Sequence, residues 1–110
     1  MKIKLFEIAN TRSGDKGANS NVGIIFKNKK AYQWAVKNLT SKIVKRYFKS
    51  VVKGNVVRYE LPKLWALNFI LHDSLGGGGS ESLINDAQGK THGQALSMME
   101  VEVPSEIIKG

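Results

Sequence analysis

The residues best suited to binding chemistry lie between Asn10 and Asn21, in the segment N-T-R-S-G-D-K-G-A-N-S-N. This segment has no large apolar side chain and separates two apolar runs, residues 3–8 and 22–26. Because a hairpin needs only about two to five loop residues, a polar connection of this length in a small domain is expected to be functional. We therefore predict a binding loop whose ligand-binding residues are Arg12, Ser13, Gly14, Asp15, Lys16, Gly17 and Asn19.

The residue types of this predicted loop suit an anion. Arg12 and Lys16 supply positive charge, and backbone N–H groups around Gly14 and Gly17 can form an anion-binding nest. The pattern is not a P-loop, because the second glycine leads into a strand and not through Lys-Ser/Thr into a helix. The alternative is that Asp15 pairs with one of the two cations and braces the loop. The carboxylate of Asp15 favours a mixed hydrogen-bonding site over a bare phosphate site.

Two further polar segments follow in the last third of the chain. The run G-G-G-G-S at 76–80 is either a flexible linker or a stretch of backbone that passes close to a ligand or partner. The segment D-A-Q-G-K-T at 86–91 is a polar turn. The supporting contacts that we expect from this part of the chain are Asn68, Gly77, Gly78, Ser80, Asp86, Gln88 and Lys90.

The sequence shows no catalytic or metal-binding constellation. There is no cysteine, which excludes disulfides, thiolate nucleophiles and cysteine-based metal sites. The two histidines, His72 and His92, are isolated in the sequence, and no nucleophile stands beside a candidate base. We expect no cofactor and no metal, and whether the protein is an enzyme stays open.

Hydrophobic periodicity predicts the strands that position these residues. Strands are expected at 3–8, 22–26, 55–61 and 96–103, although residues 94–99 also fit a helical turn. The run 22–26 is almost continuously apolar, which favours a central position in the sheet.

Helical spacing is present in three other segments, at 29–39, 40–53 and 64–75. The second has Lys and Arg on one face, with Thr40 suited to the N-cap and Gly54 to the C-terminal stop. The order β-β-α-β-α-β, with helices crossing over between parallel strands, predicts one α+β domain over residues 1–110. We expect a two-layer sandwich of about four strands with two helices on one face.

The net charge of +8 is concentrated in the middle of the chain. Residues 27–63 contain eleven Lys and Arg against Glu60 alone, which favours an anionic partner or simply a solvated face. A basic nucleic-acid-binding module is the alternative function, but Tyr47 and Phe48 lie on the apolar face of the basic helix, not between its lysines. No segment has the roughly 18 apolar residues of a membrane span, so we expect a cytoplasmic protein with no membrane association.

Three segments carry a family resemblance: residues 9–25, 58–83 and 86–96. Together they resemble the C-terminal ferredoxin-like domain of the AtuA-like (acyclic terpene utilisation) proteins. The N-terminal methionine and an end shortly after Pro104 suggest that the domain is here a stand-alone small protein. The two strands expected at the start depart from the βαββαβ order of a ferredoxin-like fold.

The resemblance implies a role in the catabolism of acyclic terpenoids or related acyl-CoA compounds. It implies a large AtuA-like chain as partner, and the anion at the predicted loop would then be an acyl-CoA or another anionic metabolite. It also makes the tetraglycine run a native feature of the chain. A homo-oligomer stays open, and nucleic acid is disfavoured.

Overall fold

The computed structural model describes residues 1–16, 19–48, 52–72 and 92–109. The side chains of residues 15, 16 and 109 are outside this description. All structural statements below concern these ranges.

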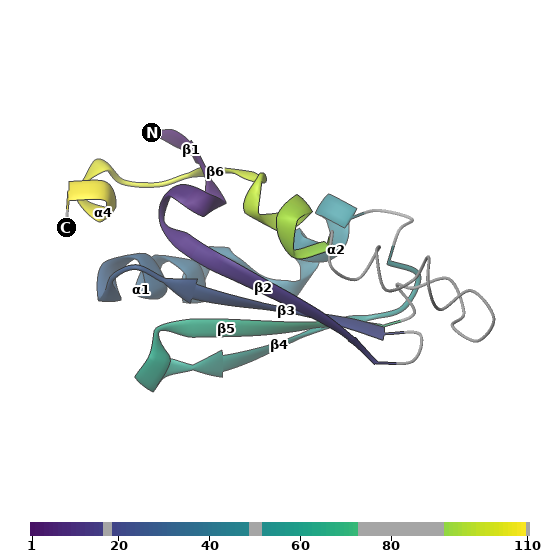
Figure 1. Ribbon diagram of the computed structural model, residues 1–110. Helices are drawn as coiled ribbons and strands as arrows, with labels where there is room; N and C mark the ends of the chain where they lie inside the picture. The colour runs from purple at the N-terminus through teal and green to yellow at the C-terminus, as the bar shows by residue number, and fades with distance from the viewer. Residues whose placement is uncertain (17–18, 49–51, 73–91, 110) are drawn as a thin grey trace.

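The centre of the domain is a four-stranded antiparallel sheet with the strand order β2-β3-β5-β4 (Figure 1). Its strands are β2 (Ala9–Lys16), β3 (Asn19–Phe26), β4 (Val56–Leu61) and β5 (Ala66–Leu71). The two central strands, β3 and β5, pair from Ser20↔Leu71 to Ile25↔Ala66. Both are rich in apolar and β-branched residues, which suits strands with neighbours on both sides.

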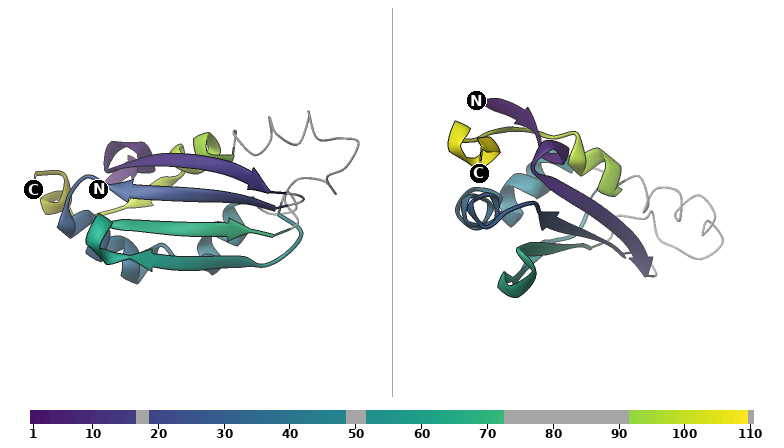
Figure 2. Two further views of the ribbon diagram at one scale, coloured as in Figure 1. Left: turned by 60° about the horizontal axis from the view of Figure 1, so that its bottom comes forward. Right: turned by 60° about the vertical axis from the view of Figure 1, so that its left-hand side comes forward.

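Two consecutive helices, α1 (Lys29–Asn38) and α2 (Ser41–Phe48), lie on one face of this sheet (Figures 1 and 2). Asn28 caps α1, since its side chain accepts a hydrogen bond from the Ala31 N–H at 2.8 Å. Thr40 accepts one from the Ile43 N–H at 3.3 Å at the start of α2, which confirms the predicted cap. The opposite face of the sheet carries no helix in the described part of the chain (Figure 2).

A second, two-stranded sheet joins the two ends of the chain. It pairs β1 (Lys2–Lys4) with β6 (Glu100–Glu102) in antiparallel register, and the short helix η1 (Leu5–Glu7) leads from β1 towards β2. Residues 92–97 are helical and precede β6, and α4 (Ser105–Lys109) follows it.

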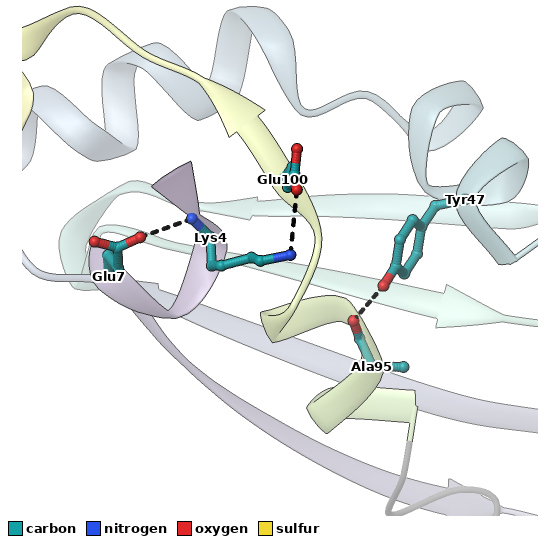
Figure 3. A network of polar contacts seen from close by, with 5 residues as sticks. All are labelled: Lys4, Glu7, Tyr47, Ala95 and Glu100. Carbon is teal, nitrogen blue, oxygen red and sulfur yellow. Dashed lines mark hydrogen bonds and ion pairs between the residues drawn. The ribbon is translucent and has the colours of Figure 1, made fainter. Parts of the chain in front are cut away.

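Polar contacts stabilise this second sheet and connect the helical residues 92–97, which precede β6, to α2 (Figure 3). Lys4 pairs with Glu100 at 3.4 Å, and its backbone N–H donates to Glu7. The Tyr47 hydroxyl on α2 donates to the carbonyl of Ala95 at 2.6 Å.

The hydrophobic core lies between the four-stranded sheet and the helices. Its fully buried side chains come from β3 and β5 on one side and from the helices and the segments that connect them on the other. The largest of them are Phe69, Leu5, Ile24, Leu39, Leu67, Leu71, Leu96, Val22, Val44, Val52 and Val103.

The predicted α+β class is confirmed, but several predicted elements are wrong. Residues 64–75 were expected to be helical, whereas the chain forms the short helix η3 (Pro62–Leu64) and then β5. Every strand pair is antiparallel, so no helix connects parallel strands. The first predicted strand stops at Lys4, and the helical-turn alternative for 94–99 is correct up to residue 97.

Candidate functional site

The predicted binding loop is in fact most of a β-hairpin. β2 and β3 pair without interruption from Ala9↔Phe26 to Lys16↔Asn19, which leaves only residues 17 and 18 between the strands. In a strand, successive N–H groups point to opposite sides, so a concave anion nest does not form along β2. The loop prediction is wrong because β2 is an edge strand whose covered-face positions include the polar Thr11 and Ser13, so its sequence shows no alternation of apolar and polar residues.

The hairpin register sorts the predicted site residues onto two faces. Side chains alternate along a strand, so Arg12 and Gly14 lie on the uncovered face, and Ser13 lies on the helix-covered face. Asn19 is the register partner of residue 16 and belongs to the uncovered face. The proposed set of binding residues is therefore divided between two environments.

On the uncovered face, which we call the open face, four residues form one row across all four strands. Arg12 is opposite Gly23, Gly23 is opposite Asn68, and Asn68 is opposite Tyr59. We call Arg12, Gly23, Asn68 and Tyr59 the polar row. The fold thus brings together Arg12 and Asn68, which the sequence analysis predicted as parts of two separate segments. It also adds Tyr59, which the sequence analysis did not predict as a site residue.

Glycine at position 23 keeps the middle of the polar row free of a side chain. A Cβ atom there would be 3.9 Å from both the Arg12 carbonyl oxygen and the Asn68 Oδ1, which is ordinary van der Waals contact. The position therefore has room for a small group and is not sterically closed. The Gly14 position is already occupied by a neighbour, since a Cβ there would lie 2.9 Å from the Oδ1 of Asn21. A glycine inside a strand often marks a bulge, but the uninterrupted register shows none at Gly23.

The charges of the open face have one sign. The guanidinium of Arg12 is exposed and forms no hydrogen bond or ion pair with any described residue. Glu60, the strand carboxylate whose side chain the structure describes, belongs to the other face by register. Glu60 instead pairs with Arg58 at 3.0 Å. Among the side chains that the structure describes on the four strands, the open face therefore presents the cation of Arg12 and no carboxylate.

Exposed apolar side chains gather at the end of the open face where β4 turns into β5. Ile25 and Leu61 belong to the row next to the polar row, one strand repeat or roughly 7 Å away. Leu64 and Trp65 lie in the turn beyond Leu61. We call Ile25, Leu61, Leu64 and Trp65 the apolar end, and each is at least 40 % exposed.

Trp65 has a backbone conformation that side chains rarely adopt. Its φ angle is 51°, in the left-handed region, and no other non-glycine residue among the described ones has a positive φ. A left-handed residue with a Cβ atom costs about 1–2 kcal/mol. The turn is held by hydrogen bonds from the Trp65 N–H to the Pro62 carbonyl and from the Phe26 N–H to the Trp65 carbonyl.

Beneath the hairpin, the covered face holds a pair of polar side chains that sequence reasoning missed. The Oγ of Ser20 lies 2.8 Å from Nδ1 of His92, and the two residues are only 2 % and 4 % exposed. Burial lowers the pKa of His92, and the edge of its ring packs against Phe48. Nearby, the Thr11 hydroxyl donates to the carbonyl of Gly93 at 3.0 Å.

A serine beside an imidazole is the arrangement of an activated nucleophile. Here both side chains are enclosed, so the pair holds the helical residues 92–97 against β3 and is not open to a substrate carbonyl. The two residues are 72 positions apart in the chain, which explains why spacing did not reveal them. The only signal was that Ser20 and His92 both lie within segments that carry the family resemblance.

Part of the positive charge in the middle of the chain has a structural role. Arg58 donates to the carbonyls of Val36 and Leu39 at the end of α1, at 3.0 and 3.1 Å. Lys45 donates to the carbonyls of Val52 and Gly54. Such cations complement the carbonyl end of a helix and the loop that follows it.

Gly54 has a different role from the predicted helix stop. A Cβ atom there would lie 2.7–2.9 Å from the backbone and Cβ of His72, so Gly54 permits a close approach to the end of β5.

The remaining predicted contacts lie outside the described residues. These are Gly17, Gly77, Gly78, Ser80, Asp86, Gln88 and Lys90, together with the side chains of Asp15 and Lys16. In the described ranges there is no group of three His, Asp or Glu residues that could hold a metal ion. Those ranges also contain no helix long and apolar enough to cross a membrane.

An antiparallel sheet covered by helices on one face, with Arg12 and exposed apolar side chains on the other, defines a small α+β domain. Comparison with protein families identifies the domain: the AtuA ferredoxin-like domain matches residues 3–102. The chain belongs to this family. Searches of curated proteins and of solved structures found no match.

Proposed function

We propose that this chain is a small subunit or accessory domain that binds a large AtuA-like chain through the open face of its sheet. A sheet in a two-layer domain has two faces to cover, and the helices cover one. The other face keeps large apolar side chains in water at its apolar end. Burying such side chains against a partner contributes roughly 25 cal/mol for each Å² removed from water.

The observation that carries this proposal is the exposed, left-handed Trp65 at the apolar end. Tryptophan is among the residues that dominate binding energy at protein interfaces. Residues in sparsely populated backbone conformations are concentrated at functional sites. A position that would accept glycine without strain is occupied here by the largest side chain, and 40 % of it is exposed.

The family membership supplies the expected partner and the metabolic setting. Because the domain belongs to the AtuA ferredoxin-like family, a larger AtuA-like chain is the natural partner. We propose that the complex acts in cytoplasmic catabolism of acyclic terpenoids or related acyl-CoA compounds.

A second candidate function is binding of an anionic metabolite, such as an acyl-CoA, at the polar row. The observation in its favour is the exposed Arg12 guanidinium beside the side-chain gap at Gly23. Asn68 can add hydrogen bonds to the same anion.

The docking proposal is tested by a matched pair of substitutions. Leu61 on the open face and Ile108 on α4 are 42 % and 43 % exposed, so replacing either by Asp perturbs the folded domain to a similar degree. With an AtuA-like large chain from the same organism, Leu61→Asp is expected to weaken binding about 30-fold or more, and Ile108→Asp by less than about threefold. Equal affinities of the two variants would contradict the proposed docking face. So would a stable homodimer that Leu61→Asp dissociates, because a second copy would then cover the face.

The metabolite proposal has a separate test on the isolated domain. Coenzyme A or an acyl-CoA at about 100 times its dissociation constant should raise the stability of the domain by about 2.7 kcal/mol. Combined Arg12→Ala and Lys16→Ala substitution should remove that gain. A gain that survives both substitutions would show that the polar row is not the anion site.

A further inference from the structure

We propose that the polar row recognises a carboxylate side chain of the large AtuA-like partner, so that the open face accepts an acidic segment flanked by apolar residues. This inference rests on the proposed docking function and specifies the chemistry of the partner. Arg12 is the residue that pairs with the carboxylate, and Asn68 and Tyr59 are its neighbours on the row.

The sign of the charge follows from the strand register. Among the described side chains of the four strands, Arg12 is the one charged residue on the open face, whereas Arg58 and Glu60 are placed on the covered face. The strand carboxylate with a described ion pair, Glu60, is thus paired with Arg58 away from the docking surface. Covering the open face with an apolar or basic partner would leave the Arg12 guanidinium buried and unpaired, which is strongly unfavourable. A partner carboxylate removes that cost.

The geometry of the polar row suits a carboxylate that approaches the open face of the sheet. Arg12 presents a planar fork of N–H donors that can bind both oxygens of one carboxylate. The absence of a side chain at Gly23 leaves space between Arg12 and Asn68. The Asn68 amide and the Tyr59 hydroxyl offer further donors for the remaining lone pairs of an acidic side chain and its backbone.

The shape of the surface favours a protein over a small molecule at this position. Small-molecule sites are concave and enclose most of the ligand. Arg12, Gly23 and Asn68 lie on neighbouring strands of a sheet face that no described helix covers, so the described residues do not enclose a ligand there. The neighbouring apolar end would exclude water from the charge pair once the partner is in place, which strengthens the pair.

The test compares charge substitutions on and off the open face, with the AtuA-like large chain as the probe. Arg12→Glu is expected to weaken binding about 100-fold, because it both removes the pair and introduces repulsion. Arg12→Lys should retain part of the affinity, since the charge remains but the bidentate geometry is lost. Lys37→Glu on the exposed side of α1 makes the same change in net charge and should alter affinity by less than about threefold.

A single acidic residue of the large chain should restore binding to Arg12→Glu when it is replaced by Lys. Equal losses in the Arg12→Glu and Lys37→Glu variants would mean that only overall charge matters, and the inference would be overturned. If Leu61→Asp abolishes binding while Arg12→Glu does not, the docking face stands and the carboxylate pairing falls. If neither substitution matters, the proposed function falls as well. Coenzyme A binding to the isolated domain that depends on Arg12 would make a metabolite the occupant of the row and also overturn the inference.

Discussion

The left-handed Trp65 allows a quantitative prediction about the apolar end. Replacing it by Ala or by Gly removes the same indole, so the packing lost is nearly equal and cancels when the two variants are compared. At φ 51° a Cβ atom costs about 1–2 kcal/mol. Glycine, in turn, loses about 0.5–1 kcal/mol relative to alanine through its greater freedom in the unfolded chain. Trp65→Gly should therefore be more stable than Trp65→Ala by about 1 kcal/mol, the reverse of the usual order.

Urea unfolding of both variants measures this difference directly, and thermal unfolding should show it as about 4 °C in Tm. Both variants should bind the large AtuA-like chain equally weakly, since each lacks the indole. A Trp65→Ala domain as stable as the Trp65→Gly domain would refute the reasoning. It would show that the Cβ atom at this φ costs no more than the roughly 0.5–1 kcal/mol penalty of glycine, and the argument that Trp65 is kept there for binding would lose its basis.

Three further predictions concern the scaffold. Arg58→Met should lower the free energy of unfolding by about 2–4 kcal/mol in urea titrations, because it removes two charge-assisted hydrogen bonds to the end of α1; a loss below about 0.5 kcal/mol would contradict this role. Gly54→Ala should cost about 1–3 kcal/mol, because its Cβ would collide with the backbone of His72, and an unchanged urea midpoint would argue against that close approach. Burial lowers the pKa of His92, so the unfolded chain binds a proton that the folded domain does not; stability should be full above about pH 6.5 and fall as the pH decreases towards the lowered pKa, and a His92→Gln variant with the same pH dependence would contradict this assignment.

Hydrophobic periodicity correctly predicted several elements that bury one regular face or lie at the centre of the sheet. α1, α2, β3 and β4 all occur close to where the pattern places them, because each buries one regular face or, for β3, lies at the centre of the sheet. β5 was missed because its short apolar run A-L-N-F-I-L fits both periods, and such runs cannot be assigned from spacing alone. β2 was missed for the opposite reason, since its covered-face positions after Ala9 include the polar Thr11 and Ser13, so no apolar alternation marks the strand.

The candidate site could be predicted only in part for the same physical reason. Arg12 and Asn68 were named from their chemistry, but their placement in one row depends on a strand register that local patterns do not contain. The exposed Trp65 lies in a stretch predicted to be helical, so its unusual φ had no signal in the sequence. The contact between Ser20 and His92 is a tertiary contact between residues 72 positions apart, which local sequence patterns do not predict.

The central claim, that the open face binds the large AtuA-like chain, is tested most directly by cysteine footprinting. The chain has no cysteine, so a single one can be introduced on either layer without a competing thiol. Tyr59→Cys places it on the open face, and Lys37→Cys places it on the exposed side of α1. Addition of the large chain should slow thiol labelling of the Tyr59→Cys variant at least about tenfold and leave the Lys37→Cys variant unchanged. Protection of the Lys37→Cys variant alone would show that the helical layer is the docking surface and contradict the account.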